Sequence, residues 1–112
     1  TLLGKEEEKV DLDLDPQHLR VIAEGMRQGV LDGTGRVLQI PGVSVASKSG
    51  TAELGVKKDL INSWISGYFP YENPRYAFVI IMEKGDVHIL QGAVFAARET
   101  IEWMRDNTEY TK

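Results

Sequence analysis

The alternation of hydrophobic and polar positions predicts two helices on either side of a group of strands. After Asp15 as N-cap and Pro16 as first helical residue, hydrophobic side chains recur at steps of three and four on one helical face: Leu19, Ile22, Ala23, Met26 and Val30. His18 lies off this stripe and is expected to be exposed. A second such stripe predicts a C-terminal helix of about four turns: Val94, Ala97, Ile101 and Met104.

Three stretches between the helices favour extended chain. One begins at Val43, one covers residues 61–69, and one covers residues 76–82. The last is continuously hydrophobic, which predicts a strand buried on both faces, and residues 83–86 are expected to form a turn. Short connections favour antiparallel pairing. The predicted fold class is therefore α+β: a three-stranded antiparallel sheet flanked by an N-terminal and a C-terminal helix.

The other segments carry shorter patterns. In the lead-in, residues 1–15, hydrophobic and acidic residues alternate from position 10, which predicts a half-buried extended segment. Gly33-Thr34-Gly35 predicts a tight turn, and residues 37–40 a short extended piece. The tail, residues 105–112, is expected to fray. The aromatic residues of the second strand are expected to pack in the core: Trp64, Tyr68 and Phe69.

Composition narrows the class of protein. The chain has 112 residues, enough for one domain, and its net charge of −4 argues against a nucleic-acid binder. It has no cysteine for a disulfide or a thiolate zinc site. The three aspartates of residues 11–15 lack the glycine and glutamate of a calcium loop, so neither a metal nor a cofactor is expected. No hydrophobic run approaches the ~20 residues that span a bilayer.

The stretch most suggestive of chemistry is Val-Ala-Ser-Lys-Ser-Gly-Thr-Ala-Glu, residues 45–53. A cation, small hydroxyls and a bare backbone on one extended edge suit the binding of a carboxylate and a developing oxyanion. Strand alternation sets Lys48 and Gly50 against Ser49 and Thr51, so the four line one groove only on a twisted edge strand. The alternative reading is a polar edge strand whose lysine blocks edge-to-edge pairing.

A nucleotide-binding loop is a remote alternative for the same residues. Positions 42–49 nearly match G-x-x-x-x-G-K-[ST], but Ser47 stands where the second glycine is needed. Such a loop also opens a helix, whereas Val43 and Val45 favour extended backbone.

A family resemblance emerges when the flanking residues are included. Lys48-Ser49-Gly50 is similar to the third motif of serine transpeptidases and β-lactamases. The Gly-Met-x-x-x-Val of residues 25–30, the Gly-Thr-Gly of residues 33–35 and the strand at residues 62–70 surround it as they do in penicillin-binding proteins. Residues 16–104 together resemble the transpeptidase domain of these proteins, closest to the monofunctional class B enzymes that cross-link peptidoglycan.

The resemblance implies a role for each residue of the motif. Lys48 would face the nucleophile region, and the hydroxyls of Ser49 and Thr51 would bind the carboxylate of a D-alanyl-D-alanine stem peptide or a β-lactam antibiotic. Gly50 would let the substrate backbone pass close. The backbone N–H of Thr51 would donate to the oxyanion, a contact typically worth ~3–4 kcal/mol of barrier.

Two motifs of the family have no counterpart here: the chain has neither the Ser-x-x-Lys that carries the nucleophile nor the Ser-x-Asn. We therefore expect residues 1–112 to be one C-terminal fragment of the domain, inactive alone and partnered by the remainder of that domain. Other cell-wall synthesis proteins are further candidate partners. The resemblance also implies an extracytoplasmic location, with a membrane anchor outside these residues. The alternative within the same fold is a non-catalytic β-lactam sensor.

Overall fold

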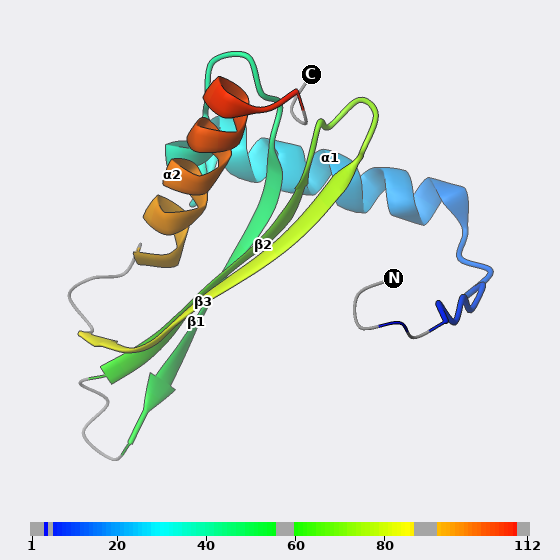
Figure 1. Cartoon of the computed structure of the whole chain (residues 1–112). Helices are drawn as coiled ribbons and strands as arrows, with labels where there is room; N and C mark the ends of the chain where they lie inside the picture. The colour runs from blue at the N-terminus through cyan, green and yellow to red at the C-terminus, as the bar shows by residue number, and fades with distance from the viewer. Residues whose placement is uncertain (1–3, 5, 56–59, 87–91, 110–112) are drawn as a thin grey trace.

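A computed structural model describes residue 4 and residues 6–55, 60–86 and 92–109. Its strands form one antiparallel sheet in the order β1-β2-β3, with a helix before and after it in the chain (Figure 1). This confirms the predicted α+β class. The elements are α1 (Pro16–Asp32), the 3-10 helix η2 (Arg36–Leu38), β1 (Ala46–Leu54), β2 (Leu60–Phe69), β3 (Tyr76–Asp86) and α2 (Gly92–Asn107).

Both helices contribute to a single core on one face of the sheet. Ile61, Ile65 and Phe69 of β2 point into it, because side chains alternate along a strand and residues separated by an even number of positions share one face. One core cluster contains Ile65 and Phe69 together with Val30 of α1 and the buried face of α2. The predicted stripe of α2 is confirmed: Val94, Ala97 and Ile101 are buried and Met104 packs against them.

The opposite face of the sheet is open in the described part of the chain. Trp64 of β2 is 41% exposed, and Val79 and Ile81 of β3 are 66% and 37% exposed. The prediction that residues 76–82 are buried on both faces is therefore wrong, because both helices pack on the other side. The core position predicted for Trp64 is also wrong, whereas that of Phe69 is confirmed.

The boundaries of β3 and α2 differ from those predicted. Residues 83–86 continue β3 rather than forming a turn, because β2 extends back to Leu60 and pairs with them. The predicted fraying at 105–112 is wrong for Arg105–Asn107, which complete α2. Arg105 also donates from Nη1 to the Pro41 carbonyl at 3.0 Å, which ties this end of the helix to the body.

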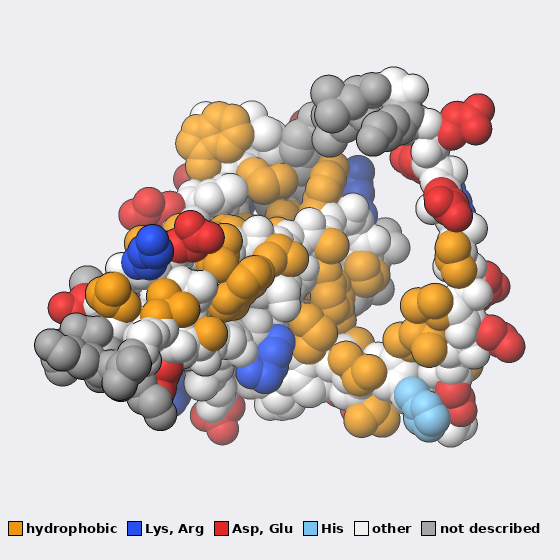
Figure 2. All heavy atoms as spheres, turned by 90° about the horizontal axis from the view of Figure 1, so that it is seen from below, with side chains coloured by type: hydrophobic (Ala, Val, Ile, Leu, Met, Phe, Trp, Pro, Cys, Tyr) orange, Lys and Arg blue, Asp and Glu red, His pale blue; other side chains and the backbone are white. Residues whose placement is uncertain are grey.

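The N-terminal third shows less burial than its pattern predicted. Asp15 caps α1 by accepting from the Gln17 amide, as expected, but Leu19 and Ile22 of the stripe are 46% and 57% exposed. The side chains of residues 10–15 are exposed rather than half-buried, and no strand pairs with them in the described residues. Figure 2 shows this segment, with its alternating acidic and hydrophobic side chains, separated by a gap from the main body of the molecule.

The connection between α1 and β1 is held by side chains from both helices. It contains η2, so the short extended piece predicted at residues 37–40 is wrong. Arg27 of α1 donates from Nη1 to the Val45 carbonyl at 2.8 Å, and Arg98 of α2 donates from Nη1 to the Val37 carbonyl at 2.6 Å. Charged donors form the stronger class of hydrogen bond, and these fix the path of the chain into β1.

Candidate functional site

The Lys-Ser-Gly-Thr sequence lies in the middle of β1, at one edge of the described sheet. Only β2 pairs with β1 among the described residues, so the outer side of β1 presents backbone groups without a strand partner there. The edge position that a groove requires is thus observed. Residues 46–54 form a strand and not the loop-to-helix start of a phosphate loop, which counts against the nucleotide-binding alternative.

The strand register divides the four residues between the two faces of the sheet. Lys48 pairs with Ser66 and Gly50 with Trp64, which places both on the open face. The Lys48 Nζ donates to the carbonyl of Ser49 at 2.5 Å, so this side chain folds back along its own strand.

The hydroxyl-bearing residues lie on the other face. Ser49 pairs with Ile65, and Thr51 pairs with Ser63, whose hydroxyl accepts from the Ala93 amide of α2 at 3.3 Å. The roles that the resemblance implies for Lys48, Ser49, Gly50 and Thr51 remain predictions. The structure shows their placement on two sides of one edge.

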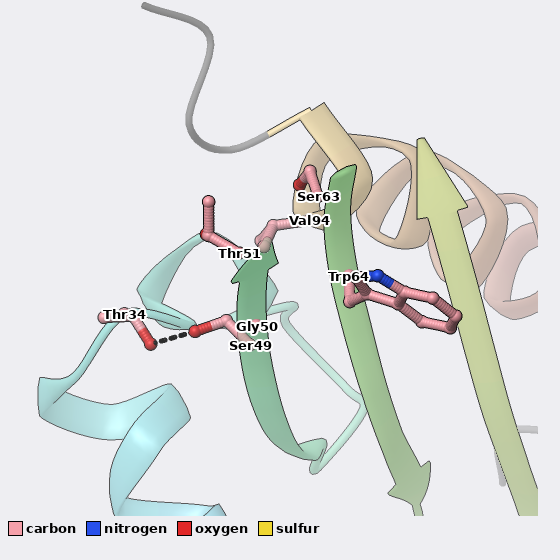
Figure 3. A pocket seen from close by; sticks show the side chains of 7 residues that line it. All are labelled: Thr34, Ser49, Gly50, Thr51, Ser63, Trp64 and Val94. Atoms are coloured by element: carbon pink, nitrogen blue, oxygen red, sulfur yellow. Dashed lines mark hydrogen bonds between the residues drawn. The ribbon is translucent and has the colours of Figure 1, made fainter. Parts of the chain in front are cut away.

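A hollow of about 220 Å³ opens beside the edge of β1 on the side of α2. Ser49, Gly50 and Thr51 line it, so three of the four predicted site residues meet there. Figure 3 shows the hydroxyls of Thr34 and Ser49 turned toward each other at this hollow. The remaining lining residues come from the turn after α1, from β2 and from α2: Thr34, Ser63, Trp64 and Val94.

Thr34 is a residue of this site that the sequence analysis treated only as part of a turn. Its Oγ1 lies 2.6 Å from the Oγ of Ser49, within hydrogen-bonding distance, across 15 positions of sequence. Its only local hint is the position between two glycines. That pattern indicates a turn but does not show which strand the turn faces.

The two glycines around Thr34 let the turn approach β1. A Cβ added to Gly35 would lie 2.6 Å from Ser47 Oγ, and one added to Gly33 would lie 2.9 Å from the Gly29 backbone. The amides of both glycines donate to the Gly29 carbonyl, at 3.1 Å from Gly33 and 2.9 Å from Gly35. The turn is therefore pinned to the end of α1 at both sides of Thr34.

Two other expectations concern residues outside this site. His18 is exposed in the first turn of α1, as predicted, and lies 3.9 Å from Asp15. His88, which the sequence predicts to be a structural or exposed residue, lies outside the described residues. No helix in the described parts of the chain has the length and hydrophobicity needed to cross a membrane.

Comparison with known protein families shows to which family the chain belongs. Residues 4–101 match the family model of the penicillin-binding protein transpeptidase domain. The chain belongs to the penicillin-binding protein transpeptidase family. The predicted resemblance to this transpeptidase domain is confirmed. The matched range includes Lys48-Ser49-Gly50-Thr51 as well as Thr34.

Solved structures of transpeptidases support the same assignment. The chain is 29% identical to the D,D-transpeptidase domain of a peptidoglycan glycosyltransferase from Eggerthella lenta, with a TM-score of 0.64, and covers 76% of itself and 19% of that chain. The chain is also 29% identical to a D,D-transpeptidase domain from Legionella pneumophila, with a TM-score of 0.63; the match covers 78% of this chain and 35% of that one. Its identity to penicillin-binding protein A from M. tuberculosis, solved as an imipenem acyl-enzyme complex, is 29%, with a TM-score of 0.62; the match covers 80% of this chain and 19% of that one. The chain thus spans a fifth to about a third of these proteins.

Proposed function

We propose that this chain supplies the substrate-binding edge of a serine-type peptidoglycan D,D-transpeptidase, with β1 as the edge. The observation that carries the proposal is the location of Lys48-Ser49-Gly50-Thr51 on an edge strand beside a hollow, within a chain of the transpeptidase family. An extended stem peptide ending in D-alanyl-D-alanine is a suitable partner for such an edge, because an extended peptide adds to an exposed strand through main-chain hydrogen bonds.

The side chains of the edge match the parts of such a substrate. The hydroxyls of Ser49 and Thr51 border the hollow and are donors for the terminal carboxylate. Gly50 is exposed on the strand, and the lack of a side chain leaves room for a peptide to approach. We assign the backbone N–H of Thr51 to the oxyanion of the tetrahedral intermediate.

Lys48 completes the proposed edge from the open face of the sheet. The register places Lys48 on the same face as Trp64 and Val79, where no described element covers the sheet. We assign that side to the remainder of the transpeptidase domain, including the nucleophilic serine and its base. The lysine would then lie between the nucleophile region and the bound carboxylate.

The proposed reaction is acyl transfer. The serine oxygen attacks the carbonyl of the penultimate D-alanine, the peptide bond breaks, and the terminal D-alanine leaves with a proton on its amine. An amine of a second stem peptide then attacks the acyl-serine ester, which forms the cross-link and regenerates the serine. With a β-lactam, the same attack opens the ring and no group leaves. The reaction takes place on the outer side of the cytoplasmic membrane, where peptidoglycan is cross-linked.

The proposal is tested on the complete protein that carries this chain. We expect covalent labelling by a fluorescent penicillin, blocked by prior incubation with unlabelled penicillin, and release of D-alanine from a D-alanyl-D-alanine peptide in the presence of an amine acceptor. Labelling without peptide turnover would show a non-catalytic penicillin-binding sensor instead. Residues 1–112 alone are expected to gain no mass from penicillin. A mass increase equal to the drug would overturn the proposal that the nucleophilic serine lies outside these residues.

A further inference from the structure

The contact between Thr34 and Ser49 adds a residue to the proposed carboxylate-binding edge. Their oxygens are 2.6 Å apart, a normal to short separation for two hydroxyls. Neither side-chain oxygen has another hydrogen-bond partner among the described residues. Both residues line the hollow beside β1 (Figure 3). The pair is therefore available to a ligand and not occupied elsewhere in the described structure.

Two hydroxyls joined in this way always leave one proton free. Each hydroxyl has one proton to donate and two lone pairs to accept, and either oxygen of this pair can be the donor. If Thr34 donates to Ser49, the Ser49 proton remains for a ligand. If Ser49 donates, the Thr34 proton remains. In both cases the donor that remains belongs to a hydroxyl already polarised by its partner, which strengthens its next hydrogen bond.

The geometry of the turn makes Thr34 a rigid member of this pair. Gly33 and Gly35 both donate to the Gly29 carbonyl, and Gly35 lies against Ser47, the β1 neighbour of Ser49 on the same face. The backbone that carries Thr34 is thus fixed relative to the strand that carries Ser49. A hydroxyl held from outside the strand limits the rotation of the Ser49 side chain.

We propose that Thr34 is a positioning residue of the transpeptidase site: it orients the Ser49 hydroxyl so that the pair presents one donor to the carboxylate of the substrate. The inference rests on the proposed function, because it assumes that the carboxylate binds at this edge. It extends the site to the turn after α1, beyond the four residues of the β1 motif.

The test compares two ligands that differ only at the carboxylate, on the complete protein. Second-order rate constants of acylation are measured for benzylpenicillin and for its methyl ester, which lacks the negative charge. Thr34→Val is expected to lower the constant for the acid by roughly three- to tenfold, the effect of losing one ordinary hydrogen bond, and that for the ester by less than about twofold. The ratio of the two constants is independent of the fraction of active protein.

Three further variants separate positioning from general structure. Thr34→Ser keeps the hydroxyl and should restore most of the acid-to-ester ratio lost in Thr34→Val. Ser49→Ala should cause the same selective loss, and adding Thr34→Val to it should lower the ratio no further. The matched control is Thr100→Val, because the one partner of the Thr100 hydroxyl in the described parts of the chain is the Ala96 carbonyl of its own helix. This control should leave both constants unchanged.

Each outcome decides the proposal. Equal losses for acid and ester in Thr34→Val, or no loss for either, would overturn it. If Thr34→Val does not fold, as judged by circular dichroism, Thr34→Ser and Ser49→Ala still decide it: a retained ratio in Ser49→Ala would overturn it. If the unmodified protein is not acylated at all, the proposed function has failed and the inference falls with it, a result distinct from the others.

Discussion

Replacing Gly35 by alanine tests whether the turn and β1 are packed as closely as the structure shows. The backbone of Gly35 has a φ of −95°, a value open to any residue, so alanine introduces no dihedral strain. Its Cβ would lie 2.6 Å from Ser47 Oγ and 3.2 Å from the Gly29 carbonyl oxygen. The contact with Ser47 lies in the interior, since Gly35 is buried and Ser47 is only 3% exposed.

The expected cost follows from two opposing effects. Overpacking of a well-packed interior costs about 1–3 kcal/mol. A glycine-to-alanine change at a permitted φ stabilises by about 0.4–1 kcal/mol through the unfolded state. We therefore expect Gly35→Ala to lower the free energy of unfolding by roughly 1–2 kcal/mol. The control is Gly25→Ala in α1, where an added Cβ meets nothing within 4 Å, and which should stabilise by about 0.5–1 kcal/mol.

The cause of the cost is tested by removing the atom that clashes. The Ser47 Oγ is buried and has no hydrogen-bond partner among the described residues, so Ser47→Ala alone should change stability by less than about 1 kcal/mol or improve it. In combination with Gly35→Ala, it should recover about 1 kcal/mol or more as a coupling energy. The assay is urea denaturation of the complete transpeptidase domain, followed by circular dichroism. Additive effects of the two substitutions would refute the close packing of the turn on β1.

Two further predictions concern the supports of the same connection. Ser44 donates to Glu72 at 2.5 Å, and this hydrogen bond lowers the pKa of the Glu72 carboxyl, with backbone hydrogen bonding and Arg27 contributing less. Ser44→Ala should raise the pKa of the Glu72 carboxyl toward its usual value in a carbon-detected NMR titration. In the unmodified protein this contact stabilises the fold above the usual pKa, and the stabilisation is lost as the pH falls through the lowered pKa; the variant should lack it. An unchanged pKa would contradict the contact. Arg98→Ala removes the guanidinium bond to the Val37 carbonyl and should lower the free energy of unfolding in urea by about 1–2 kcal/mol. Glu102→Ala, which removes only the partly exposed ion pair of Arg98, should cost less than about 1 kcal/mol, and equal losses would contradict the role given to the carbonyl bond.

Local sequence patterns correctly predicted the start of α1 and the buried face of α2. Asp15 and Pro16 begin α1, and the stripe of α2 is buried, because capping and helical periodicity depend on neighbouring residues. The burial of Val79 and Ile81 was overestimated because hydrophobic content does not show how many faces of a sheet are covered. The burial of Leu19 and Ile22 was overestimated because helical periodicity does not show whether another element covers the hydrophobic side of the helix.

The site was predictable in its strand and not in its surroundings. Lys48-Ser49-Gly50-Thr51 has a recognisable order, but its position at an edge depends on the order of the strands in the sheet, which the structure shows and the sequence does not. Thr34 could not be assigned, because its contact to Ser49 spans 15 positions and depends on how the turn packs against β1. Its two neighbouring glycines indicated a turn, but their close approach to Gly29 and Ser47 is visible only in three dimensions.

The most direct test of the account is labelling of the complete protein with a fluorescent penicillin, followed by mass spectrometry of the labelled peptide. We predict one equivalent of label on a serine outside residues 1–112. Prior incubation with unlabelled penicillin should abolish this labelling, and Lys48→Ala should slow it strongly. A label within this chain, or no label on a correctly folded protein, would contradict the claim that β1 is the binding edge of a divided transpeptidase site.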